Sequence, residues 1–134
     1  MIDVEVLGTG REPAALPPRE VRRLCVLTAA HMGVEQAHVA VEFVDAERIA
    51  QLNGEHRNKA VPTDVLSFPI DGLAARSPTA VPVELGDVVI CPEHTVDVRE
   101  AVVHGMLHLL GMDHETDDGE MLELQRELLA GADG

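Results

Sequence analysis

Three histidines near the C-terminal end of the chain have the spacing of a metal site. The stretch HGMLHLLGMDH, residues 104–114, places His104, His108 and His114 in the frame H-x-x-x-H-x-x-G-x-x-H. Residues four apart on a helix lie on one face, so His104 and His108 can bind one ion. Gly111 is a helix stop, after which the chain can turn back and bring His114 to the same ion. The spacing predicts one divalent metal ion on three imidazoles, and Zn²⁺ suits such ligands well.

A zinc protease of this frame carries a glutamate at the position that Gly105 occupies here. That glutamate takes a proton from the zinc-bound water and passes it to the leaving amine. Glycine can do neither, which disfavours peptide hydrolysis by this route. Three protein ligands leave one position of a tetrahedral ion open, and an open position favours a catalytic site over a structural one. Asp113 is either a hydrogen-bond partner that orients a ligand histidine or a solvated turn residue.

The charge balance restricts the partners of the protein. The 134 residues have a formal net charge of −14, from 24 acidic side chains against nine arginines and one lysine, Lys59. An acidic surface repels phosphate, which excludes a general nucleic-acid binder with a basic face, and we expect no DNA partner. An RNA substrate would need a local cationic cleft or a protein partner that delivers it.

Composition and length also predict the compartment and the domain organisation. Cys25 and Cys91 lie far apart without a C-x-x-C pattern, which predicts two free thiols in a reducing compartment. We find neither a signal-peptide pattern nor an apolar run long enough to span a membrane, and so predict a cytoplasmic protein without a membrane partner. The length is that of one domain, residues 1–134.

Hydrophobic periodicity predicts the elements that position the histidines. Alternating apolar residues predict strands over 2–7, 38–45, 63–70 and 85–93, with a surface loop over 71–82. Helical spacing and end signals predict helices over 17–32, 45–54 and 96–110, and a last helix that begins at Asp117 with Glu120 in a capping box. The expected fold class is therefore α/β (α+β): a single mixed sheet of about four strands packed with helices. In it, the metal-site helix is followed by a turn and a C-terminal helix.

The histidine stretch and three others resemble one known family. HGMLHLLGMDH, together with LNGEHRNKAVPTDVLSFP at 52–69, LGDVVIC at 85–91 and the closing MLELQRELL, is similar to the YbeY family of bacterial endoribonucleases and rRNA maturation factors. The resemblance covers most of the chain from Val39 onward. It implies a metal on the three histidines, cleavage of single-stranded RNA, and roles in 16S rRNA 3′-end processing and ribosome quality control. His56 and the short segment between Cys91 and His104 depart from the family pattern.

The family pattern has an arginine that falls on Arg57. A guanidinium can fork onto two phosphate oxygens and, beside a metal, stabilise the charge that develops as phosphorus is attacked. The alternative is a solvated surface arginine. Asp87 precedes an apolar run, and its carboxylate could hold Arg57 or a ligand histidine or satisfy backbone donors; we favour structural support. Thr63 and Asp64 are expected to make turn hydrogen bonds.

Three functions are compatible with these residues. The first is a metal-dependent endoribonuclease acting on rRNA and ribosomal particles with protein partners, in which either water or the ribose 2′-hydroxyl attacks. The second is a zinc hydrolase of another substrate, with Glu115 as a substitute base. The third is a zinc-stabilised, non-catalytic ribosome-assembly factor. We expect the first.

Overall fold

Helices and strands follow one another in the predicted order. The computed structural model describes residues 2–8, 16–57, 61, 63–71, 83–112 and 117–133. The elements are β1 (Ile2–Leu7), α1 (Pro18–His31), β2 (Ala37–Phe43), α2 (Ala46–Arg57), β3 (Val65–Pro69), β4 (Val83–Ile90), the 3₁₀ helix η2 (Pro92–His94), α3 (Val98–Leu109) and α4 (Glu120–Asp133). The order β-α-β-α-β-β-α-α predicted from periodicity is confirmed, with η2 as an additional short turn.

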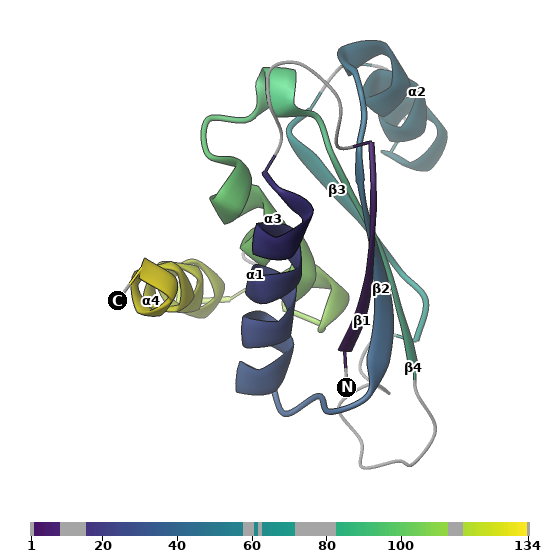
Figure 1. The fold of residues 1–134 in the computed structure, drawn as a ribbon. Helices are drawn as coiled ribbons and strands as arrows, with labels where there is room; N and C mark the ends of the chain where they lie inside the picture. The colour runs from purple at the N-terminus through teal and green to yellow at the C-terminus, as the bar shows by residue number, and fades with distance from the viewer. Residues whose placement is uncertain are drawn as a thin grey trace.

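A single mixed sheet of four strands forms the centre of the fold, as predicted (Figure 1). Its order is β1-β2-β4-β3, in which β1, β2 and β4 run parallel and β3 runs antiparallel to β4. Helices α1, α3 and α4 lie on one side of the sheet, and α2 lies on the other. Helix α3 contacts α1, α4, β3 and β4, so the metal-site helix lies between the sheet and the outer helices.

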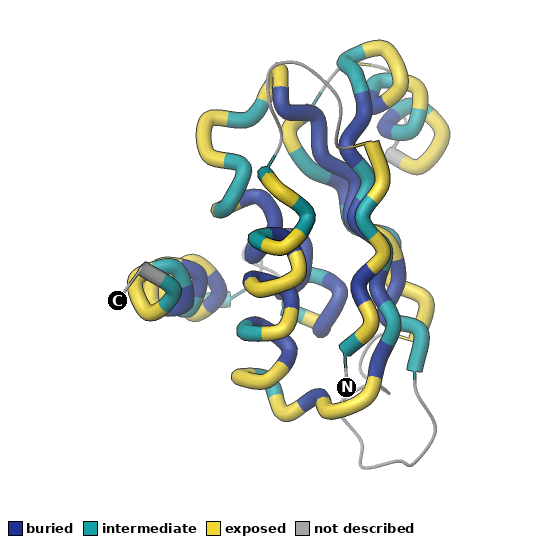
Figure 2. The backbone as a smooth tube through the Cα atoms, viewed as in Figure 1, coloured by how far each residue is buried: buried dark blue, intermediate teal, exposed yellow. Residues whose placement is uncertain are grey.

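The two faces of the sheet differ in composition. Because side chains alternate along a strand, β2 directs Val39, Val41 and Phe43 to the side of α1 and α3, where all three are buried. This side holds the main core, and the strands and helices that enclose it carry the dark blue, buried segments of the tube in Figure 2. The opposite side has a small second cluster under α2, which consists of Val44, Ile49, Leu66, Val89 and Cys91.

Beyond α2, the second side of the sheet carries charged residues. We call this surface the acidic face; its residues are Asp3, Glu5, His38, Glu42, Glu84 and Asp87. His38 and Glu84 are register partners on β2 and β4, and their side chains meet with 2.7 Å between Nδ1 and Oε1. Strand alternation separates this surface from the histidine-bearing helix on the other side.

The prediction that Gly54 ends the second helix was wrong. Helix α2 continues through this glycine to Arg57. Asn53, almost completely buried, donates from Nδ2 to the carbonyl oxygen of Val61 at 3.0 Å, which fastens the C-terminal turn of α2 to the chain that follows. Tertiary contacts of this kind offset the roughly 1 kcal/mol by which glycine disfavours a helix interior. Across the described ranges, no helix has the length and apolarity that would let it cross a membrane.

Candidate metal centre

Both ends of α3 are specified by their sequence. The helix begins two residues later than predicted, because Asp97 is its N-cap and accepts from the backbone N–H groups of Arg99 and Glu100. At the other end, Gly111 has φ 97° and donates to the carbonyl oxygen of His108, while Met112 donates to that of Leu107. This pair of bonds is a Schellman motif. The predicted role of Gly111 as a left-handed helix stop is confirmed.

His104 and His108 lie on one face of α3, as their spacing predicted. Both side chains are half-buried, and their rings meet edge to face with 4.8 Å between centroids and 74° between ring planes. Two neighbouring imidazoles, one of them at the wall of a cavity, are donors that suit a zinc ion. His114 and Asp113, predicted as third ligand and supporting residue, lie outside the described residues, as does Glu115. Within the described ranges no group of three candidate ligands occurs.

Gly105 faces the sheet, not the cavity. A Cβ atom added there would lie 2.5 Å from Cγ1 of Val88 on β4 and 3.4 Å from Oγ of Ser67 on β3. The Oγ of Ser67 also donates to the carbonyl oxygen of Gly105 at 3.0 Å. The helix therefore lies so close to the sheet that only glycine fits. A glutamate at this position would enter the core and would not reach the metal centre.

Gln125 is a residue of the site that the sequence analysis missed. It projects from α4 with only 4% of its surface exposed, and its Oε1 lies 2.8 Å from Nδ1 of His104. The signal in the sequence is a polar residue on the apolar stripe of the last helix, between Met121 and Leu128, both of which are buried. The stripe shows that position 125 faces inward, but not which residue it contacts.

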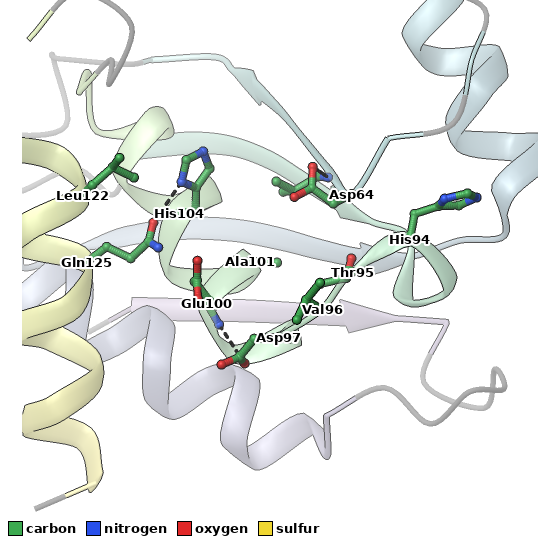
Figure 3. Close-up of a pocket in the computed structure, with 11 residues that line it drawn as sticks. Asp64, His94, Thr95, Val96, Asp97, Glu100, Ala101, His104, Leu122 and Gln125 are labelled. Carbon is green, nitrogen blue, oxygen red and sulfur yellow. Dashed lines mark hydrogen bonds between the residues drawn. The ribbon is translucent and has the colours of Figure 1, made fainter. Parts of the chain in front are cut away.

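A cavity of about 270 Å³ lies beside His104 (Figure 3). Its walls come from α3, α4, the start of β3 and the short connection between η2 and α3. Carboxylates of Asp64, Asp97 and Glu100 line it, together with His94 and the exposed side chain of Val96. Its acidic lining disfavours phosphate.

Arg57 and Asp87, the other two predicted site residues, lie on α2 and β4, on the side of the sheet that α3 does not cover. Arg57 is the last residue of α2, which packs on the side of the sheet opposite α3; its side chain lies outside the described parts. Asp87 lies on the acidic face, at a second cavity of about 380 Å³ that it shares with His56 and Phe68. The carboxylate of Asp87 is thus on the side of α2.

The surroundings of Asp87 are acidic, unlike those of a site that binds an anion. Partial burial, and then the neighbouring Glu84 carboxylate, raise the pKa of Asp87. The His56 ring packs on the Phe68 ring with centroids 4.6 Å apart. His56 departs from the family pattern, and its imidazole ring makes a ring–ring contact of the kind that aromatic residues make.

The remaining candidate residues have structural roles. Oδ1 of Asp64 accepts from the backbone N–H of Val65 at 2.8 Å and from the hydroxyl of Thr63 at 3.3 Å, which confirms the predicted turn hydrogen bonds. Both cysteines are buried and free, as predicted. Burial raises the pKa of the Cys25 thiol to about 12 and also raises that of Cys91, so neither is a ready nucleophile.

Comparison with known proteins assigns the chain to a family. The family model described as endoribonuclease YbeY matches residues 18–133. The chain belongs to the YbeY family. The YbeY protein of Rubrobacter xylanophilus is 36% identical over 137 residues, which cover 98% of this chain and 96% of the relative. The YbeY protein of Thermobifida fusca is 45% identical over 113 residues, covering 71% and 72% of the two chains. Both relatives are named endoribonuclease YbeY.

A solved structure supports the same fold. The solution structure of TM1509 from Thermotoga maritima is similar with a TM-score of 0.55 and 26% identity, covering 93% of this chain and 85% of that one. The overall fold of this YbeY family member therefore resembles one determined by experiment. The resemblance noted from the histidine stretch and its companion segments is confirmed.

Proposed function

We propose that this protein is a metal-dependent endoribonuclease that cleaves single-stranded regions of rRNA. Its substrates include the 3′ region of 16S rRNA, and it acts in the cytoplasm in ribosome maturation and quality control. The observation that carries the proposal is the His104–His108 pair on one half-buried helix face of a YbeY family member. RNA cleavage itself is supported by relatives named as endoribonucleases.

In this proposal the histidines bind a metal ion and an arginine binds the phosphate. His104, His108 and His114 hold one divalent ion, with Zn²⁺ the expected one. When bound, that ion supplies a Lewis acid for a phosphate oxygen. Arg57 is the last residue of α2, and its side chain lies outside the described parts; the role proposed for it is to fork onto the phosphate and stabilise the negative charge that increases during attack on phosphorus. Analysis of the product ends identifies the attacking group, because a 2′,3′-cyclic phosphate requires the ribose 2′-hydroxyl.

The charge of the chain argues that RNA reaches the site with help. A net charge of −14 and the carboxylates of Asp64, Asp97 and Glu100 beside His104 oppose binding of a polyanion. We therefore expect weak cleavage of isolated RNA and faster cleavage of RNA presented by a ribosomal particle or a protein partner. Tight binding of naked RNA at physiological salt would contradict this part of the proposal.

The test is cleavage of a single-stranded RNA with the 16S 3′ region, alone and on ribosomal particles, with bound metal quantified. Arg57→Ala should keep its metal and lose cleavage, whereas His114→Ala should lose both. Glu115→Gln should cleave like wild type, and a DNA of the same sequence should stay intact. If neither Arg57→Ala nor His114→Ala changes cleavage while His114→Ala loses metal and unfolds more easily, the metal is structural. The protein then works through contacts as an assembly factor.

A further inference from the structure

Gln125 is a buried polar residue where packing alone would favour an apolar one. Of the residues that the structure describes, only Thr28, Asn53 and Gln125 are both polar and buried. Met121 and Leu128, four residues before and three after Gln125, are buried on the same stripe of α4. Burying an amide costs free energy unless its hydrogen bonds are made. The position is therefore polar because of what the amide contacts.

The contact determines where the proton of His104 lies. The oxygen of the Gln125 amide can only accept a hydrogen bond, so Nδ1 of His104, 2.8 Å away, donates to it. A neutral imidazole carries one proton, and a proton on Nδ1 leaves the lone pair of Nε2 available. Figure 3 shows Gln125 reaching His104 from α4. The hydrogen bond therefore selects one tautomer and also restricts the rotation of the ring.

We propose that Gln125 is the positioning residue of the metal centre: it holds His104 in the Nδ1–H tautomer, so that Nε2 binds the metal. This inference rests on the metal site of the proposed function. It also couples two elements, because α4 must be docked through Met121 and Leu128 for the His104 ring to be held. Partners of this kind orient ligand histidines in zinc proteins and contribute about 10–100-fold to metal affinity.

An amide suits this position better than the carboxylate that often serves as such a partner. Asp64, Asp97 and Glu100 already line the adjacent cavity, and a fourth carboxylate would add to the repulsion of a phosphate substrate. Gln125 supplies the same accepting oxygen without a charge. Gln125→Glu should therefore preserve the geometry at His104, whereas Gln125→Leu keeps the size of the side chain and removes the acceptor.

The test combines zinc affinity, from competition with a chromophoric chelator, with the histidine tautomers of the metal-free protein from ¹⁵N NMR. The variants are Gln125→Leu, Gln125→Glu and the control Arg126→Leu, an exposed site next along α4. Wild type should show His104 protonated at Nδ1. Gln125→Leu should shift it toward Nε2–H and weaken zinc binding about 10–100-fold. Gln125→Glu should bind zinc at least as tightly as wild type, and Arg126→Leu should match it.

Several outcomes would overturn the inference. Zinc affinity in Gln125→Leu equal to wild type, or His104 protonated at Nε2 in wild type, overturns the role of Gln125 and leaves the proposed metal site intact. An equal loss of zinc affinity in Gln125→Leu and Gln125→Glu would mean that the effect comes from packing, and would also overturn the role of Gln125. If wild-type protein binds no zinc, the proposed metal site and this inference fail together. The wild-type tautomer is measured without mutation, so poor folding of one variant does not prevent a decision.

Discussion

The two faces of the single sheet contrast sharply in what they do for the protein. On one face, strands β2 and β4 present buried apolar side chains, and α3 packs so closely that a Cβ added at Gly105 would lie 2.5 Å from Cγ1 of Val88. On the other face, α2 covers only one end of the sheet. The rest of this face is the acidic face, whose charged side chains are partly or fully exposed. Dense packing fixes side-chain positions, whereas exposed charges are adjustable and screened by salt. Side chains that must keep a fixed geometry, as the proposed metal ligands His104 and His108 must, therefore gain from lying on the packed side.

The same contrast explains the missing protease glutamate. Position 105 on α3 points at Val88 and Ser67 and is part of the contact that holds the histidine helix down. Glycine is therefore required by packing, independently of the reaction that the site performs. The HGMLH segment and the HExxH segment share a ligand spacing, but the position after the first histidine serves different purposes in the two.

The largest effect expected on the packed face comes from Gly105→Ala. The new Cβ meets the β-branched side chain of Val88, which has little freedom to move away. We expect the free energy of unfolding to fall by about 1–3 kcal/mol, as for other overpacked cores, measured by chemical denaturation. The double variant Gly105→Ala/Val88→Ala should be less destabilised than the sum of the two single changes.

Gly131→Ala is the matched control. Gly131 lies in α4, is exposed, and has no atom within 4 Å of an added Cβ. This substitution should raise stability by roughly 0.5–1 kcal/mol, because alanine favours a helix and meets nothing. If both glycine substitutions stabilise the protein equally, α3 is not held in close contact with the sheet.

A smaller loss is expected for Ser67→Ala on the same face. It removes the hydrogen bond from Oγ to the Gly105 carbonyl oxygen, a partly buried contact between β3 and α3. The expected decrease in the free energy of unfolding is about 1 kcal/mol. Calorimetry should show a lower Tm, and unchanged stability would mean that this bond does not anchor the helix.

On the acidic face, Asp87→Asn should act in the opposite direction. Desolvation and the Glu84 carboxylate raise the pKa of Asp87, so ionising it costs more in the folded than in the unfolded protein. The neutral amide should stabilise the fold at pH 7, by no more than about 0.5 kcal/mol for so exposed a site. The gain should shrink with added salt and disappear once the pH falls below the ordinary pKa of aspartate, about 3.9. A loss of stability at pH 7 would show that Asp87 makes a supporting contact.

The smallest effect expected is a pH dependence from His38. A hydrogen bond to Glu84 raises the pKa of His38, so protonated His38 stabilises the folded protein. That contribution is complete below the unfolded pKa of about 6.5 and is lost as the pH rises through the higher folded value. It is modest because the two side chains are 34% and 41% exposed. His38→Gln should flatten this part of the stability profile, and an unchanged profile would contradict the pairing.

Much of the fold follows from local sequence signals. Alternation along 38–45 predicts β2, and Gly111 predicts the Schellman end of α3, because both signals depend on neighbouring residues alone. Gly54 shows the limit of this reasoning: its helix-ending tendency is outweighed by contacts of α2 that the sequence does not display.

The site was predicted only in part, for a similar reason. The face shared by His104 and His108 is a property of one helix and could be read from spacing. The partner of His104 lies 21 residues along the chain, on α4, and depends on how two helices dock. The steric role of Gly105 depends on the distance between α3 and β4. Single-sequence patterns contain neither of these distances.

The most direct test compares one histidine from each face. Zinc content and cleavage of single-stranded RNA are measured for His108→Ala, on the packed face, and for His38→Ala, on the acidic face. We expect His108→Ala to lose zinc and cleavage while remaining folded, and His38→Ala to keep both. Wild-type zinc content and cleavage in His108→Ala would show that the histidines of α3 do not carry out the chemistry of this protein.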